Sequence, residues 1–421
     1  MLRRDIPVIL HEMRPQCMTP AHHTGRLSEL VCSNSLRSDR LENGVGLLKE
    51  EMRQLDSLIM AAADHTRVPA GGALAVDRDS FSDYLENTLT AQPGFTLVRE
   101  EIEKIIPDVP LIVAAGPLCS EALSESIKDY IGGGQLYFYD AAAPIVFHDS
   151  LDHDTIFRAS RYDRGNDYLN CPMNREEYLL FYEALVNAER VERRDFEKGE
   201  LFAGCMPVEE MARKGENTLR FGPLKPVGLT DPRTGESPYA VVQLRQDDKQ
   251  GTLYNLVGFQ TNLKHPEQKR VFGMIPGLQN ARFARYGVMH RNTFIHSPGL
   301  LDHTYRVKDE TRPLYFAGQI TGVEGYVESA AGGLAAGLSM AMEIQGESFA
   351  GFPSETMIGA MGQYVSGYVG KDFQPMNANF GLLPPLGEKI RKKKERKEAY
   401  ARRSLGQIES IRGQIGGGDC P

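Results

Sequence analysis

The chain has 421 residues, of which 41% are hydrophobic, so it is long enough for two to three domains with separate cores. No apolar run is long enough to span a membrane, and its six unevenly spaced cysteines do not form a disulfide framework. The net charge of −8 excludes non-specific wrapping of nucleic acid, so an RNA partner would need a local basic surface. The basic start at residues 1–4 lacks the long apolar stretch of a signal peptide, which favours a cytoplasmic protein with reduced thiols.

The first half of the chain alternates predicted strands and helices. Residues 7–10 form an apolar run that ends near Glu12, which is typical of a strand buried in a parallel sheet. A polar stretch at 14–43 has no periodicity and predicts a long loop, and a helix with one apolar face follows at 48–59. Further strands are expected at 96–98 and 111–116. This alternation predicts an α/β fold whose sheet is buried on both faces.

The character of the sequence changes after residue 141. Asn174 and Glu177 form a capping box that begins a helix, and strands are expected at 239–244 and 253–259. A strand at 313–318, a helix of small residues at 329–342 and a charged helix at 390–405 follow. The pattern predicts a smaller inserted α/β domain. The expected units are 1–140 (first part of the main domain), 141–299 (insertion), 300–385 (second part) and 386–421 (basic helix and tail).

Glu12 and the glycine-rich run at 318–329 are candidate cofactor residues. An acid at the end of the second strand of a dinucleotide-binding unit accepts hydrogen bonds from ribose hydroxyls, although an isolated Glu12 is more often a solvated strand-end carboxylate. The run at 318–329 follows a strand and opens a helix, an arrangement that brings backbone N–H groups to an anionic or carbonyl-rich ligand. For this run, cofactor contact is favoured over a purely structural turn.

Two cysteines and two histidines are candidates for chemistry. A thiolate can add to C6 of uracil and so turn C5 into a nucleophile, which Cys32 or Cys205 could do, although most cysteines are inert. Cys205 gains weight from its flexible Gly-Cys-X-Pro setting. No cysteine or histidine pair has the spacing of a zinc site, so we expect no metal and assign His22 and His23 to hydrogen bonding with substrate or cofactor.

A basic run lies near the C-terminus, in the predicted helix at 390–405. It either neutralises RNA phosphates or forms a solvated helix face, and the sequence leaves both open. The candidate tRNA-binding residues in it are Lys392, Lys393, Lys394, Arg396 and Lys397.

Several stretches resemble the methylenetetrahydrofolate–tRNA (uracil-5-)-methyltransferase family over nearly the whole chain. The stretches that carry the resemblance are 18–24, 32–38, 68–78, 161–163, 204–207, 241–247, 318–329 and 373–381.

The resemblance implies a glutathione-reductase-type, Rossmann-like FAD-binding domain with an inserted domain. It further implies that reduced FAD takes the one-carbon unit of methylenetetrahydrofolate, with NAD(P)H as the electron donor. A cysteine then adds to a T-loop uridine, and 5-methyluridine is formed. On this basis Cys205 is the expected nucleophile and Cys32 a proton-handling or protective partner. The residues expected to contact cofactors are Glu12, Arg14, His22, His23, Gly116, Gly318, Gln319, Gly322, Val323, Glu324, Gly325 and Tyr326.

The family pattern begins with a strand and a Gly-x-Gly-x-x-Gly turn, whereas this chain begins in what resembles the end of the helix that follows. Either the start lies at an internal methionine or the segment is lost, and the first is favoured. As written, the chain is expected to bind FAD weakly and to aggregate. Two rival functions stay open: a flavin oxidoreductase acting on a small molecule, and a non-catalytic remnant that binds folate or RNA.

Overall fold

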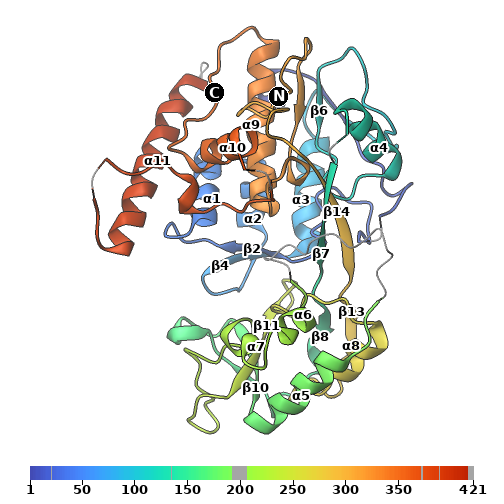
Figure 1. Cartoon of the computed structure of the whole chain (residues 1–421), viewed down its shortest axis with the longest axis vertical. Coiled ribbons are helices and arrows are strands. Elements are labelled where there is room, and N and C mark those ends of the chain that lie inside the picture. The colour runs from blue at the N-terminus through green and yellow to red at the C-terminus, as the bar shows by residue number, and fades with distance from the viewer. Residues whose placement is uncertain (20, 134, 192–205, 371–372, 388, 416–421) are drawn as a thin grey trace.

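A computed structural model describes residues 1–19, 21–133, 135–191, 206–370, 373–387 and 389–415. Figure 1 shows a larger upper part that holds most of the helices and a smaller lower part built around a sheet. The smaller part is inserted in the sequence between two stretches of the larger one. None of the helices formed by the described residues is long and apolar enough to cross a lipid bilayer.

Two parallel strand pairs underlie the larger part. β1 (Val8–His11) pairs with β5 (Phe95–Val98), and β6 (Leu111–Val113) pairs with β15 (Leu314–Phe316). Residues 305–307 run antiparallel along the other edge of β15. Within the described ranges β1 has no second neighbour, and its Ile9 is 63% exposed. The prediction of a buried strand is therefore wrong for β1. Among the described residues no strand pairs with its second edge, and the side chain of Ile9 is exposed.

Seven helices and a small antiparallel sheet complete the described larger part. The sheet has the order β2 (Ser35–Ser38), β4 (Ala73–Val76), β3 (Arg67–Val68). The helices are α1 (Gly44–Gln54), α2 (Leu58–His65), α3 (Arg78–Thr90), α4 (Glu121–Tyr130), α9 (Tyr326–Ile344), α10 (Met357–Gly367) and α11 (Lys393–Ile415). The predicted loop at 14–43 thus contains a strand. Leu36 is the only apolar residue of β2, so this strand has no alternating hydrophobic pattern.

The inserted part contains a six-stranded antiparallel sheet. Its order is β13 (Phe283–Arg285), β8 (Ile145–Phe147), β12 (Leu253–Leu256), β11 (Ala240–Gln246), β10 (Tyr168–Met173), β9 (Phe157–Arg158). Its helices are α5 (Arg175–Asn187), α6 (Val208–Arg213), α7 (Thr218–Phe221) and α8 (His265–Phe272), and α5 begins at the predicted capping box of Asn174. The ladder of β7 (Gln135–Ala141) with β14 (Met289–Ile295) connects the two parts.

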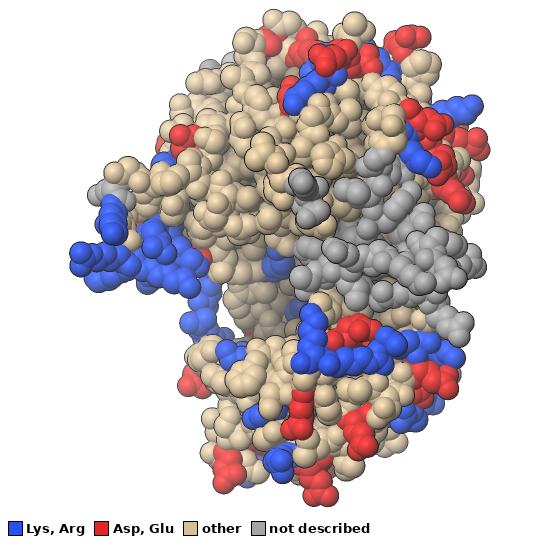
Figure 2. Space-filling model, in the orientation of Figure 1, with Lys and Arg blue, Asp and Glu red and all other residues tan. Residues whose placement is uncertain are grey.

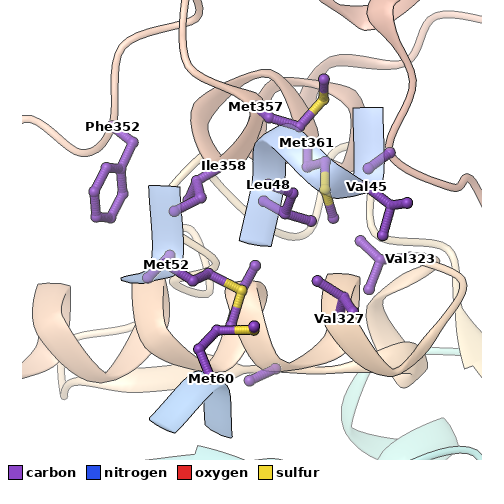
Figure 3. Close-up of a cluster of buried hydrophobic side chains, with 14 of the residues drawn as sticks. Val45, Leu48, Met52, Met60, Val323, Val327, Phe352, Met357, Ile358 and Met361 are labelled. Carbon is purple, nitrogen blue, oxygen red and sulfur yellow. The ribbon is translucent and has the colours of Figure 1, made fainter. Parts of the chain in front are cut away.

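The core of the larger part lies where α1, α9 and α10 meet. Figure 3 shows Val45, Leu48 and Met52 of α1 between the side chains of α9 and α10, and each labelled residue is at most 6% exposed. Methionine is unbranched and flexible, so Met52, Met357 and Met361 fill the irregular gaps between these helices, and Met60 of α2 packs into the same core.

The C-terminal helix docks on this core through a buried carboxylate. Glu51 on α1 accepts hydrogen bonds from the N–H groups of Met357, at 2.7 Å, and Ile358, at 2.9 Å, and from the Ser404 hydroxyl of α11. α11 extends to Ile415, beyond the predicted end at 405, because Ile408 and Ile411 bury an apolar stripe against the larger part.

Glu51 is expected to make stability depend on pH. Burial raises the pKa of its carboxyl to about 7, above the value of about 4.3 in an unfolded chain. This contribution to stability is fully present below the unfolded pKa and is lost as the pH rises through 7. Between about pH 4 and pH 8 the wild type should therefore lose on the order of 3 kcal/mol more unfolding free energy than Glu51→Gln. Urea unfolding at both pH values measures this, with Glu50→Gln as the control. An identical pH dependence for wild type and Glu51→Gln would contradict it.

Candidate active site

Glycines with positive φ shape the turn between β15 and α9. Gly318, Gly322 and Gly325 have φ values of 83°, 88° and 113°. A Cβ on Gly322 would lie 2.5 Å from the Phe373 ring, and one on Gly325 would lie 2.4 Å from Glu328 Oε2, so neither position has room for a side chain. Gly325 therefore begins α9 without a side-chain cap, and the first backbone N–H groups of that helix are left for another acceptor.

Backbone hydrogen bonds with Met376 and a side-chain hydrogen bond within the turn hold the turn in place. Met376 N–H donates to the Gly322 carbonyl at 3.1 Å, and Glu324 N–H donates to the Met376 carbonyl at 3.0 Å. Gln319 Nε2 donates to Glu324 Oε2 at 2.6 Å, which ties two predicted cofactor residues to each other. Val323 is 1% exposed and belongs to the core, so its side chain is not available to a ligand.

Cys32 contacts Tyr326, the first residue of α9. The Cys32 backbone N–H donates to Tyr326 Oη at 2.9 Å, and Cys32 Sγ lies 3.1 Å from the same oxygen. Burial, followed by the neighbouring Cys32, raises the pKa of Tyr326 well above its ordinary value, so the phenol stays protonated at neutral pH. The structure thus brings a predicted catalytic cysteine and a predicted cofactor residue into one site.

Arg245 of β11 brings the inserted part to the segment that carries Cys32. Arg245 is 7% exposed, and it donates to Ser33 Oγ at 2.9 Å and to Asn34 Oδ1 at 3.1 Å. Asn34 in turn donates to the carbonyls of Val76 and Gln246, each at 3.0 Å. The residues next to Cys32 are therefore fixed by contacts with both parts.

A second contact between the parts is the ion pair of Arg78 and Asp247. Arg78 Nε lies 2.8 Å from Asp247 Oδ2, whose side chain is 2% exposed, and Arg78 also donates to the Leu30 carbonyl. Nearby, Arg285 donates to the Ala21 carbonyl at 3.1 Å, while its buried Nε has no hydrogen-bond partner. Arg78 and Arg245 thus bring positive charge close to Cys32, and this charge favours an anionic ligand there.

The predicted residues Glu12, Arg14 and His23 belong to a hydrogen-bonded cluster around Glu29, and His23 lies within electrostatic range of Arg285 and Arg78. Burial alone would raise the pKa of Glu12, but hydrogen bonds from Arg14 outweigh it and hold the pKa low. Arg14 also reaches Glu29, which accepts from the His23 backbone N–H at 2.9 Å. Glu12 therefore stays ionised as a hydrogen-bond acceptor at the carboxyl end of β1.

Of the two other predicted cofactor residues, His22 lies close enough to Glu12 and Glu29 to interact with them electrostatically, and Gly116 belongs to a different segment, after β6. His22 Nδ1 lies 2.6 Å from Thr19 Oγ1. Gly116 follows β6 with a φ of 69°, and no described heavy atom lies within 4 Å of where its Cβ would be. Backbone at Gly116 is thus open to close approach by a ligand.

The basic residues at the start of α11, together with Lys392 directly before it, are mostly exposed. Figure 2 shows Lys and Arg side chains at the N-terminal end of α11, beside the hollow between the two parts. Lys392 and Lys394 are 79% and 76% exposed, and Lys393 and Arg396 are exposed as well. Lys397 differs, because its Nζ donates to the Glu42 carbonyl at 2.6 Å.

Sequence reasoning missed the three arginines, and it placed one cysteine where the structure gives no description. Arg78 and Arg245 lie in the stretches 68–78 and 241–247 noted above, but their charge was given no role. The sequence signal that could have identified these two arginines is their position next to or within an apolar strand. Cys205 lies outside the described residues. In the part of the chain that the structure describes, no group of His, Cys, Asp or Glu is arranged to hold a metal ion.

Parallel strand pairs, a glycine turn opening a long helix and an inserted domain define an α/β, Rossmann-like protein of the FAD-binding class. The solved structure of Aquifex aeolicus GidA in crystal form I has this fold, with a TM-score of 0.68 at 15% identity, over 97% of this chain and 72% of that one. The form II crystal gives a TM-score of 0.65 over 91% of this chain and 67% of that one, also at 15% identity. The sequence model described as glucose inhibited division protein A matches residues 1–348.

Curated relatives define the family more closely. The methylenetetrahydrofolate–tRNA-(uracil-5-)-methyltransferase TrmFO of Heliobacterium modesticaldum is 61% identical over 97% of this chain and 93% of its own length. The TrmFO proteins of Listeria monocytogenes and Bacillus subtilis are each 58% identical, over 98% and 97% of this chain and 94% of their own lengths. The chain belongs to the TrmFO family.

The ion pair of Arg78 and Asp247 is expected to couple the two parts energetically. Asp247→Ala should lower the free energy of unfolding by about 3 kcal/mol, because it leaves the part-buried Arg78 without its carboxylate. Arg78→Ala with Asp247→Ala should cost clearly less than the sum of the single changes. A double-mutant cycle from denaturant unfolding measures this coupling, and additive costs would show that the pair is energetically unimportant.

Proposed function

We propose that this protein methylates C5 of a uridine in the T-loop of tRNA, with methylenetetrahydrofolate as carbon donor and FAD as cofactor. The observation that carries the proposal is the identity of 58–61% with TrmFO proteins over 97–98% of the chain. The contact of Cys32 with Tyr326, at the start of α9, supports the proposal.

The described residues fit a flavin nucleotide. The uncapped N-terminus of α9 offers backbone N–H groups to a carbonyl or phosphate oxygen, and the ionised Glu12 is an acceptor suited to ribose hydroxyls. Gly318 and Gly116 leave open backbone, since a Cβ on Gly318 would meet nothing closer than 3.8 Å. When bound, FAD supplies the redox chemistry and carries the one-carbon unit.

The two predicted cysteines have different roles in the proposal. The Cys205 thiolate adds to C6 of the uridine, and the electrons of the C5–C6 double bond then make C5 a nucleophile. Once C5 has taken the one-carbon unit, loss of the C5 proton and departure of the thiolate restore the double bond, and the two-electron reduction that bound FAD would supply converts the one-carbon unit to the methyl group. Cys32, beside the protonated Tyr326, handles a proton in this sequence.

The basic N-terminal half of α11 binds the tRNA phosphates. Its exposed lysines lie beside the hollow between the two parts, and the rest of the protein is acidic overall. NADH or NADPH provides the electrons. The protein works in the cytoplasm.

The test is transfer of an isotope-labelled one-carbon unit from methylenetetrahydrofolate to a tRNA transcript by the full chain, with FAD and NADPH supplied. Labelled 5-methyluridine, detected by mass spectrometry of digested tRNA, is the expected product. Cys205→Ser should abolish it, Cys32→Ser should slow it by about 10²-fold, and Cys17→Ser should leave it unchanged. No labelled product from the wild type, or full activity of Cys205→Ser, would refute the assignment.

Removing basic residues from α11 is expected to weaken tRNA binding in a salt-dependent way. Lys392→Ala, Lys393→Ala and Lys394→Ala combined should lower the slope of log affinity against log salt by about two to three, because each phosphate contact contributes about 0.9. Fluorescence anisotropy with labelled tRNA across a salt series measures the slope. Lys104→Ala, another exposed lysine, should leave the slope unchanged. A triple variant with the wild-type slope would favour the alternative of a solvated helix face.

A further inference from the structure

Tyr162 is an exposed aromatic residue held in a left-handed backbone conformation. Its φ and ψ are 60° and 39°, and 54% of its surface is exposed. Of the non-glycine residues with positive φ in the described chain, Tyr305 is the other aromatic one, and it is buried. Left-handed backbone is unfavourable for a non-glycine residue, because its Cβ crowds the following carbonyl oxygen. A buried ring recovers that energy in the core, whereas the exposed ring of Tyr162 does not.

Neighbouring contacts hold the Tyr162 ring in place. The Tyr162 N–H donates to the Gly228 carbonyl at 2.8 Å, and the ring packs so closely on Gly228 that a Cβ there would lie 2.8 Å from it. Arg161 also holds this loop in place, because it donates hydrogen bonds to Gln243 Oε1 and to the Val227 carbonyl, both at 2.9 Å. The ring is therefore presented to solvent by a rigid support.

The Tyr162 loop is connected to the Cys32 segment through a single strand. Gln243, which accepts from Arg161, lies two residues before Arg245 on β11, so both side chains point to the same face about 7 Å apart. Arg245 in turn contacts Ser33 and Asn34. The loop also touches the larger part directly, because Asp167 accepts from the Gly71 N–H at 2.6 Å.

The surroundings of the ring favour a nucleobase over a phosphate group. Arg164 lies over the ring at 5.6 Å from its centroid, and aromatic rings and guanidinium planes are the surfaces on which unpaired RNA bases stack. Asp163, the next residue in the chain, is exposed, and its carboxylate offsets part of the positive charge of Arg164, so this loop offers a ligand the planes of a ring and a guanidinium rather than a strong net charge. The loop follows β9, the edge strand of the inserted sheet, and in Figure 1 this edge lies on the same side as α11.

We propose that Tyr162 is a stacking platform for an unpaired nucleobase of the tRNA loop that carries the target uridine. This inference rests on the proposed function, since it names a further contact with the same substrate. α11 holds the phosphates, and Tyr162 fixes the position of a base near the Cys32 site.

The test measures binding of a labelled T-arm RNA hairpin to the full chain by fluorescence anisotropy. Tyr162→Gly removes the ring and suits the positive φ, so folding is not threatened. It should bind about tenfold more weakly, while Tyr162→Phe stays within about twofold of the wild type and Tyr162→Leu resembles the glycine variant. The salt slope should be unchanged in all three, since no phosphate contact is lost. Leu180→Ala, which removes an exposed side chain from α5, is the matched control.

If Tyr162→Gly or Tyr162→Leu bound the RNA with wild-type affinity, the proposal that Tyr162 stacks on a base would be wrong, because stacking requires the ring. Equal losses in the phenylalanine and glycine variants would also overturn it, since the hydroxyl would then be the contact. Failure of the proposed function is distinguishable: the wild type itself would neither bind nor methylate the RNA.

Discussion

The placement of the inserted part on the cysteine segment depends on two buried charged contacts. Arg245 reaches Ser33 and Asn34, and Arg78 pairs with Asp247. A buried guanidinium without partners is strongly unfavourable, so the two parts must meet in a geometry that satisfies both arginines at once. Hydrophobic packing stabilises each part internally, but these directional bonds decide how the segment of Cys32 lies between them.

The glycine turn before α9 sets the other side of the site. Phe373 and Glu328 leave no space for a side chain at Gly322 or Gly325, so the turn passes close to them and delivers Tyr326 to Cys32. Glu328 is fully buried, and it pairs with Arg37 in the strand that follows the cysteine segment. The turn and the cysteine segment are therefore fixed to each other twice, once through Tyr326 and once through this ion pair.

Charge and aromatic surface are divided between different elements of this acidic protein. The basic residues of α11 offer long-range attraction to phosphates, whereas the loop at Tyr162 offers a rigid ring with an acidic neighbour. The first kind of contact is indifferent to base identity and the second is indifferent to charge. α11 is itself anchored on the buried Glu51, so its position relative to the site is set by the core of the larger part.

Local patterns in the sequence determined much of the secondary structure. Apolar runs predicted β1, β5, β6, β11, β12 and β15, and the capping box at Asn174 predicted the start of α5, because these signals involve residues close together in the chain. The resemblance supplied the family and the list of candidate residues. Neither predicted β2, whose polar residues carry no hydrophobic period, nor the exposed side of β1. The contacts of Cys32 with Tyr326 and of Arg78 with Asp247 join residues 294 and 169 positions apart, and only the tertiary structure decided them, since they arise from how separate elements pack.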